Sequence, residues 1–254
     1  MTKEWKNDLR EEAMAMARRK VVTFLRHGQA LHNPRAEAAR HATPPCSFEE
    51  FLRLMKEDDA FDAALTDIGT TQAADLYSER IKCPKLDLPP VNLVVTSPLS
   101  RAIDTAAAVF PEETKRGPFL CLENLRERNG LLLNAKRMKK TELMAKYPLV
   151  DFSNVPTEDD VLWKEEVLED ALDSANRGYR CLRYLWERPE VHIVVAAHGG
   201  IFNNILNDHP AIKADERMRR RFQNCEMRTC EMTIVEPEKD VHLLQSTIIL
   251  RAIG

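Results

Sequence analysis

The feature that most constrains this chain is a mainly apolar run, residues 21–24, that leads into Arg26-His27-Gly28. The β-branched and aromatic residues of the run predict a buried strand, and the glycine predicts a tight turn at its end. An imidazole in this position lies at the carboxyl edge of a sheet, where open α/β sheets bind their ligands. A permanent cation beside it suits a histidine that attacks a phosphoryl group.

Two further polar residues follow predicted strands in the same way. Arg101 stands shortly after residues 91–95, and His198 stands shortly after residues 191–196. Short runs rich in β-branched residues are typical of buried strands. Both side chains therefore belong at the ligand-binding edge of the predicted sheet, together with His27.

These residue types suit the transfer of a phosphoryl group. A neutral His27 imidazole can attack phosphorus in line, which forms a phosphohistidine and divides one difficult step into two. The guanidinium groups of Arg26 and Arg101 can each bind two phosphoryl oxygens and stay charged at neutral pH. They would stabilise the charge that spreads over the equatorial oxygens in the transition state. The alternatives are a histidine bonded to the backbone and a surface arginine.

His198 would donate a hydrogen bond to the phosphoryl group, as a neutral ring or as a cation, and would orient His27. Gly199 and Gly200 follow it, and such a pair lets the chain turn sharply and present N–H groups to an anion. We therefore expect Gly199 to contact the substrate. The alternative for His198 is a buried ring that satisfies a loop carbonyl.

Glu127, just past a predicted strand at 119–123, is the candidate proton donor. The leaving alkoxide needs a proton and the attacking water later needs a base, and one carboxyl group can do both in turn. Nearby arginines would lower the pKa of this carboxyl group, whereas burial would raise it. The alternative is a surface salt bridge with Arg126 or Arg128.

Two amide residues near His27 are further substrate-binding candidates. Asn33 could bond a phosphate oxygen and Gln29 could line the entrance of the pocket, or either could be a turn residue. We interpret four other histidines as packing or surface residues, namely His32, His41, His192 and His209.

Together these segments resemble branch 1 of the histidine phosphatase superfamily, also called the phosphoglycerate mutase-like family. The resemblance runs from about Val21 to about Glu231, and short segments in the second half of the chain resemble a plant and algal subgroup. It implies a three-layer α/β/α sandwich with a mostly parallel central sheet. The acid phosphatase branch has an aspartate where this chain has Gly199, so the resemblance favours Glu127 as the proton donor.

The order of predicted elements also indicates an α/β protein, because strands alternate with helices. Thr66 is a plausible N-cap for a helix at about 67–81. We expect one domain over 1–254, with an N-terminal extension over 1–20 and with inserts 34–60 and 130–165 covering the pocket. The other predicted helices are a short surface helix before the first strand and helices at about 99–110, 166–187 and 200–207. Segment 130–165 is predicted to be irregular and partly helical, and segment 209–230 is polar and basic. Antiparallel strands are predicted at 231–236 and 242–250.

Three functions share such a site. A phosphatase lets water attack the phosphohistidine, a mutase returns the phosphoryl group to a bound acid, and a non-catalytic relative only binds phosphorylated ligands. Mutases of the family carry an Arg-Arg-Ser-Tyr clamp where this chain has PLVDFS at 148–153. Loss of two arginines weakens the binding of a small dianionic acid and admits water, which favours a phosphatase. The substrate would be a phosphorylated small molecule or a phosphoprotein.

No nucleotide-binding glycine motif occurs in the sequence. Arginines close to His27 and His198 would repel a divalent cation. We therefore expect no metal and no cofactor, and activity that survives EDTA.

The formal net charge of −3 argues against non-specific binding of nucleic acid, which needs a large positive field. No segment approaches the ~20 apolar residues of a membrane-spanning helix, and residues 1–20 have no continuous apolar core typical of a secretory signal. Six scattered cysteines are typical of free thiols in a reducing compartment. We therefore expect a cytoplasmic protein, with organellar targeting and oligomeric state left open.

Overall fold

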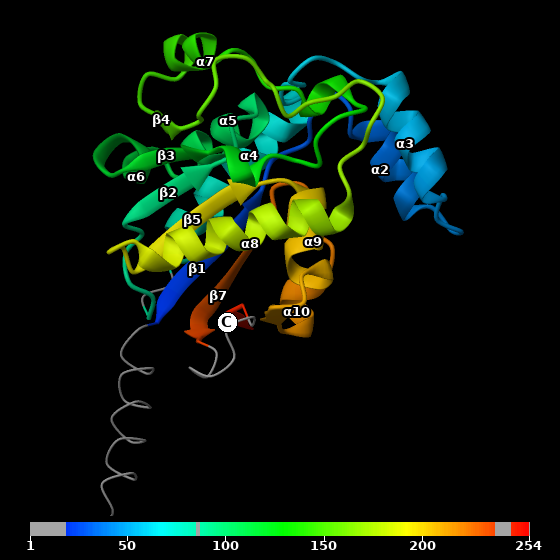
Figure 1. Cartoon of the computed structure of the whole chain (residues 1–254). Coiled ribbons are helices and arrows are strands. Elements are labelled where there is room, and N and C mark those ends of the chain that lie inside the picture. The colour runs from blue at the N-terminus through cyan, green and yellow to red at the C-terminus, as the bar shows by residue number, and fades with distance from the viewer. Residues whose placement is uncertain (1–18, 85–86, 237–244, 254) are drawn as a thin grey trace, which may run out of the picture.

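The computed structural model describes residues 19–84, 87–236 and 245–253 (Figure 1). Its centre is an eight-stranded sheet in the order β4-β3-β2-β5-β1-β7-β8-β6. Only β7 runs against its neighbours, so the predicted mostly parallel sheet is confirmed. The strands are β1 (Lys20–Arg26), β2 (Leu93–Thr96), β3 (Phe119–Leu122), β4 (Asp151–Asn154), β5 (His192–Ala197), β6 (Ile212–Ala214), β7 (Met227–Val235) and β8 (Thr247–Ala252).

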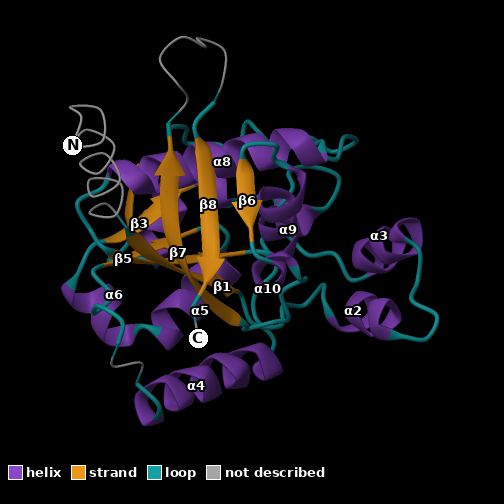
Figure 2. Ribbon diagram, turned by 90° about the horizontal axis from the view of Figure 1, so that it is seen from below, coloured by secondary structure: helices purple, strands orange, loops and turns teal. Residues whose placement is uncertain are grey.

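Helices cover both faces of the sheet, which confirms the three-layer α/β/α sandwich (Figure 2). Apolar residues of α8 and α9 pack on one face, and those of α4 and α5 pack on the other. The described helices are α2 (Pro34–His41), α3 (Phe48–Glu57), α4 (Asp67–Lys82), α5 (Ser100–Val109), α6 (Pro111–Arg116), α7 (Lys140–Lys146), α8 (Ala171–Glu187), α9 (Gly199–Asp208) and α10 (Glu216–Arg219), with 3₁₀ turns η1 (Glu123–Leu125) and η2 (Leu133–Ala135). None of these helices is long and apolar enough to cross a membrane.

The strand register brings the carboxyl ends of three parallel strands to one point. Arg26 at the end of β1 pairs with Ala197 of β5, and Thr96 at the end of β2 pairs with Ala196. Because β5 lies between β1 and β2, the residues that follow these three strands emerge side by side at one sheet edge.

The predicted elements at 67–81, 91–95 and 191–196 are found within one or two residues of their expected ends. Thr66 caps α4, as predicted, with its hydroxyl accepting from the N–H of Gly69 at 3.0 Å. The final two strands are antiparallel to each other, also as predicted. The predicted helix before the first strand falls in residues 1–18, outside the described ranges.

Two short strands were not predicted. β4 lies inside the segment expected to be irregular, and β6 lies inside the segment expected to be polar and basic. β4 is an edge strand with polar, partly exposed residues, and β6 has three residues. Neither carries the apolar run by which a buried strand is recognised. The helix expected from residue 166 begins instead at Ala171, where the Asp170 carboxylate accepts from the N–H of Leu172 and caps it.

The insert 34–60 forms α2 and α3, which stand to one side of the sandwich (Figure 2). The two helices pack together through a small apolar cluster of Ala36, Phe51, Met55 and Leu132. This cluster is separate from the two larger ones against the sheet.

The turn after β1 meets α4 through two glycines. A Cβ at Gly69 would lie 2.0 Å from the backbone oxygen of Gln29, and a Cβ at Gly28 would lie 2.5 Å from the backbone oxygen of Gly69. Real Cβ atoms do not come so close to a backbone atom, so both positions require glycine. This contact fixes the turn that follows His27 against the helix.

We predict that Gly69→Ala lowers the free energy of unfolding by about 2 kcal/mol, measured by urea denaturation, because the methyl group forces α4 away from the turn. A glycine-to-alanine substitution within a helix otherwise raises the free energy of unfolding by up to about 1 kcal/mol. The change expected for Gly69→Ala therefore has the opposite sign. Thr71→Ala, at an exposed position of the same helix, is the control and should change stability by less than about 0.5 kcal/mol. A stabilised Gly69→Ala variant would contradict this account of the contact.

Candidate active site

His27 lies just past β1 and is 2 % exposed. Its Nδ1 is 2.6 Å from the backbone oxygen of Gly28. A carbonyl only accepts, so the proton of the neutral ring is on Nδ1 and the lone pair is on Nε2. Nε2 in turn accepts a long hydrogen bond, 3.3 Å, from Nε of Arg101. The nitrogen that carries the lone pair thus faces the arginine that sequence analysis placed beside it.

Burial holds the pKa of His27 well below 6.5, and the positive charges of Arg101 and Arg26 lower it further. The hydrogen bond to Gly28 acts in the opposite direction but is the smallest contribution. At neutral pH the ring is therefore uncharged, the form that can act as a nucleophile.

Arg101, on the first turn of α5, is completely buried. Burial lowers the pKa of this guanidinium to about 10, so it stays protonated at neutral pH. Its Nη1 donates to the backbone oxygen of Asn134 at 2.7 Å. Asp62 fixes the start of the same helix, because its carboxylate accepts from the N–H of Ser100 at 2.9 Å and from the Ser100 hydroxyl at 2.6 Å.

His198 lies just past β5, and its ring centroid is 5.0 Å from that of His27. Its Nε2 is 2.7 Å from Oγ of Ser97, and that oxygen also accepts from the N–H of Leu99. The serine proton is then free to point at Nε2, which leaves the His198 proton on Nδ1. Burial and then the charge of Arg101 hold the pKa of His198 well below 6.5, so the neutral ring is favoured over the cation.

Arg26 ends β1 with a buried guanidinium. Its Nη1 donates to the backbone oxygen of Phe222 at 2.7 Å, and its Nη2 forms an ion pair with Glu37 at 2.6 Å. Glu37 comes from α2 of the insert, and sequence analysis did not single it out. Its contact with Arg26 depends on the tertiary fold, so no sequence motif indicates it.

The carboxylate of Glu127 caps the N-terminus of α9. It accepts from the N–H groups of Gly200 and Ile201 at 2.9 Å each, and from that of Arg128 at 2.9 Å. A Cβ at Gly200 would lie 2.1 Å from Oε1 of Glu127, so the glycine makes room for this carboxylate.

These contacts rule out one alternative and change one expectation. The alternative for Glu127, a surface salt bridge with Arg126 or Arg128, is not formed among the described residues, since Arg126 instead pairs with Glu123 and Asp160. The N–H groups of Gly200 and Ile201 face the Glu127 carboxylate instead of standing free for a substrate anion. A helix N-terminus attracts whichever anion lies nearest.

The two amide candidates differ. Asn33 lines the cavity, and its Oδ1 accepts from the N–H of Ala30 at 2.9 Å, as in a turn, while its Nδ2 has no acceptor among the described residues. Gln29 is not among the residues that line the cavity, contrary to expectation. Its side-chain oxygen accepts from the Thr66 hydroxyl at 2.9 Å, so it anchors α4 instead.

His32 was interpreted as a packing or surface residue, but it lines the same cavity. It is 3 % exposed, and its ring centroid is 6.2 Å from that of His27. Burial and the charges of Arg101 and Arg26 hold its pKa well below 6.5. Its position five residues after His27 is the sequence signal that could have placed it here, because a single tight turn brings the two rings together.

Four buried polar atoms around His27 have no hydrogen-bond partner among the described residues. They are Nε of Arg26, Nδ1 of His32, Nη2 of Arg101 and Nδ1 of His198. Buried polar groups in native proteins are nearly always bonded, so four such atoms in one place need an explanation. Two of them belong to guanidinium groups and so are hydrogen-bond donors, which together suit an anion with several oxygens.

The site opens into a cavity of about 330 Å³. Arg101 and His198 are fully buried and do not line it. The residues that line it include Arg26, His27, His32, Asn33, Glu37, Glu127, Asn134, Gly199 and Gly200. Gly199 lines the cavity, and its contact with a substrate stays a prediction. It lets the Arg26 side chain approach, since a Cβ there would lie 3.1 Å from Nε of Arg26.

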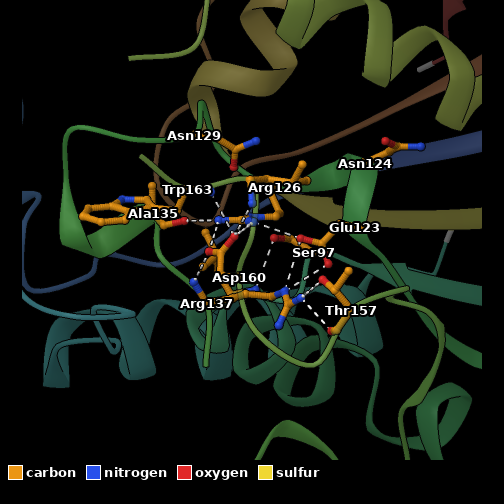
Figure 3. A network of polar contacts seen from close by, with 12 residues as sticks. Ser97, Glu123, Asn124, Arg126, Asn129, Ala135, Arg137, Thr157, Asp160 and Trp163 are labelled. Carbon is orange, nitrogen blue, oxygen red and sulfur yellow. Dashed lines mark hydrogen bonds and ion pairs between the residues drawn. The ribbon is translucent and has the colours of Figure 1, made fainter. Parts of the chain in front are cut away.

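A buried network of ion pairs and hydrogen bonds holds the turn η2 next to Arg101 (Figure 3). Arg126 forms two bonds of 2.5 Å with Asp160 and donates to the backbone oxygen of Ala135 at 2.6 Å. Arg137 joins the network through Glu123 at 3.0 Å. The turn η2, whose Asn134 oxygen holds Arg101, is thereby fixed to residues 157–163 of the second insert.

A second, larger cavity of about 720 Å³ lies at the amino ends of β2 and β5. The histidine that lines it, His192, is already bonded on both nitrogens, to Thr23 at 2.9 Å and to the backbone oxygen of Pro89 at 2.6 Å. The cavity beside His27 is therefore the better candidate for chemistry. Within the described ranges, no group of three or more His, Cys, Asp or Glu residues is arranged to hold a metal ion.

Comparison with known proteins agrees with this geometry. The family model of the histidine phosphatase superfamily (branch 1) matches residues 55–246, which include Arg101, Glu127 and His198. The chain belongs to this superfamily. The match begins after Arg26 and His27, so these two residues are placed by the structure and not by the family model.

Curated relatives of this superfamily member extend over most of its length. A phosphoglycerate mutase-like protein of Arabidopsis thaliana is 29 % identical over 85 % of each chain. Phosphoglycerate mutase-like protein 1 of the same plant is also 29 % identical, over 85 % of this chain and 82 % of its own.

A solved structure shares the fold. An Escherichia coli protein proposed to be an alpha-ribazole-5′-P phosphatase superposes with a TM-score of 0.51, covering 92 % of this chain and 96 % of its own. Its sequence identity of 18 % shows similarity of fold alone.

We predict that the His27 ring stays neutral, with its proton on Nδ1, when the pH falls from 8 to 6, because its pKa is lowered well below 6.5. The charged form then gains population only in more acidic solution. Nitrogen-15 NMR of the imidazole, assigned by loss of the signal in His27→Asn, measures both tautomer and charge. A titration midpoint at about 6.5, the value of an unperturbed histidine, would refute this.

Proposed function

We propose that this protein is a metal-independent phosphomonoester hydrolase that forms a phosphohistidine on Nε2 of His27. The observation that carries the proposal is the group of unpartnered buried nitrogens on Arg26, Arg101 and His198 around a neutral imidazole. A phosphoryl group would supply the acceptor oxygens that these nitrogens lack.

In the first step, Nε2 of His27 attacks phosphorus while the ester P–O bond breaks. Glu127 enters this step as the protonated acid and gives its proton to the leaving alkoxide, and the hydrogen bond from His27 Nδ1 to Gly28 supports the charge that develops on the ring. In the second step, water attacks phosphorus, the P–N bond breaks, and Glu127 accepts a proton from the water. Inorganic phosphate leaves and both groups return to their starting states.

The arginines and His198 do not exchange protons in this scheme. Arg26 and Arg101 bind the phosphoryl oxygens and stabilise their charge in both transition states. His198 donates from Nδ1, a direction that Ser97 fixes by bonding the opposite nitrogen. The Ser97 hydroxyl acts here by holding that ring, a role that the sequence analysis did not predict.

A mutase is the second candidate, because three arginines of unassigned role line the cavity and could hold a substrate carboxylate. They are Arg40, Arg128 and Arg221. The segment 148–153, which replaces the clamp of true mutases, lines no part of the cavity, and this favours hydrolysis. Incubation with 3-phosphoglycerate followed by phosphorus NMR separates the two, since a hydrolase releases inorganic phosphate and a mutase yields an isomeric phosphate ester.

We predict that wild-type protein releases phosphate from phenyl phosphate in the presence of EDTA and that His27→Asn lowers this rate at least about a thousandfold. Rapid acid-free denaturation during turnover should trap a phosphoryl group on His27, seen by mass spectrometry. His209→Asn is the matched control, because this ring stacks on Tyr179 outside the cavity, and it should keep wild-type turnover. Phosphate release by His27→Asn at the wild-type rate would disprove the mechanism, and no release by the wild type would leave a mutase, an enzyme of strict specificity or a binding protein.

We predict that Glu127→Gln reduces hydrolysis of an alkyl phosphate at least about a hundredfold but reduces that of 4-nitrophenyl phosphate much less. An acidic phenol leaves without a proton, whereas an alkoxide needs one. The glutamine oxygen can still accept from the α9 N-terminus, which limits the structural change. Equal losses on the two esters would show that Glu127 caps the helix and does not donate the proton.

A further inference from the structure

The cavity that begins at His27 continues along an apolar wall. Phe48, Phe51, Leu52 and Met55 of α3 line it, joined by Leu132 and Leu168 from the second insert and the segment that follows it. We call these six residues the α3 wall. The phosphoryl site and the α3 wall border one cavity of about 330 Å³, so a molecule bound at one meets the other.

Part of the α3 wall is core and part of it is open. Phe51 and Met55 are 8 % exposed and pack against Ala36 and Leu132, so they hold the insert together. Phe48, one turn earlier, leaves 55 % of its surface exposed although it lines the cavity. Sites for small molecules are usually lined by apolar and aromatic side chains with a few polar groups, and a cavity lined by Phe48 and by His27 has this composition.

Several of the charged groups that line the cavity are engaged within the protein. Glu37 pairs with Arg26 at 2.6 Å, and Asp208 lines the cavity together with Arg40, Arg128 and Arg221. Two of the cavity arginines are engaged with aromatic rings, since the guanidinium carbon of Arg40 lies 3.2 Å from the centroid of Phe51 and that of Arg128 lies 5.9 Å from that of Phe48. Arg128 also donates to the backbone oxygen of Glu169 at 3.0 Å.

We infer that the substrate is a phosphate monoester whose organic group is apolar and lies against the α3 wall. This inference rests on the proposed function for the position of the phosphoryl group. The volume suits a small molecule, because cavities for such ligands begin at about 300 Å³. Insert 34–60 would then select the substrate by burying its organic group while β1, α5 and β5 hold its phosphoryl group.

The test is the binding of n-alkyl phosphonates from ethyl to hexyl, measured by calorimetry, because a phosphonate cannot be hydrolysed and its binding does not depend on turnover. We expect the affinity to rise about fourfold with each methylene, as for the burial of CH₂ groups. Inorganic phosphate should compete with every member of the series, which places the head group at His27. An affinity that does not depend on chain length would overturn the inference.

Two variants test whether the alkyl chain lies against the α3 wall. Phe48→Ser and Leu168→Ser should each reduce the gain per methylene to less than half, whereas Leu149→Ser, exposed and outside the cavity, should retain the wild-type gain. Thermal unfolding of Phe48→Ser checks the fold, which tolerates the change because the ring is largely exposed. A wild-type gain in both wall variants would place the alkyl chain elsewhere and reject the α3 wall.

The corresponding n-alkyl phosphates separate this inference from the proposed function. Hydrolysis at a kcat/KM that is equal for ethyl and hexyl phosphate would retain the hydrolase and reject the apolar specificity. Length-dependent binding of phosphonates without hydrolysis of any ester would retain the specificity and reject the hydrolase. Rising affinity together with rising kcat/KM supports both.

Discussion

The contact between Arg101 and Nε2 of His27 is the interaction on which the rest of this site depends. It places a permanent cation 3.3 Å from an imidazole, with both groups almost completely removed from water. Burying a charge without a full set of partners is unfavourable, and the fold compensates with Asp62 at the start of α5 and the Asn134 oxygen on Nη1. Nη2 of the guanidinium remains without a partner among the described residues, and a phosphoryl anion would supply the missing acceptor.

The anchoring of Arg101 explains why the second insert is tied down by buried ion pairs. Asn134 belongs to η2, and η2 is held through Ala135 by Arg126, which is itself held by Asp160. Replacing such a pair with apolar residues often leaves stability unchanged, whereas removing one partner leaves a buried charge and is strongly destabilising. We therefore interpret the role of the network as positioning. It keeps the Asn134 carbonyl, which accepts a hydrogen bond from Arg101, at a fixed place.

The parts of this site that could be predicted are those that follow strands. Arg26, His27 and His198 each stand directly after an apolar run, so the parallel sheet itself brings them together. Ser97 and the beginning of α5 obey the same rule. The groups that sequence analysis missed, Glu37 and His32, or misplaced, Gln29, depend on contacts made by turns and inserts, for which neither periodicity nor strand position gives a rule. The sequence indicated N–H groups at the start of α9, but not that the Glu127 carboxylate would reach those of Gly200 and Ile201. The contact of Gly199 with a substrate stays a prediction.

Two of the positive centres of the site already have a carboxylate partner. Glu37 neutralises Nη2 of Arg26, and Glu127 occupies the N-terminus of α9. A phosphoryl group therefore meets a site whose remaining free donors are few and buried, and the Glu37 carboxylate reduces the electrostatic attraction of Arg26 for it. Binding energy must then come partly from another source, and in the same cavity the structure offers the partly exposed apolar side chains of α3. Discrimination between esters would arise there, since the phosphoryl end is the same for every substrate.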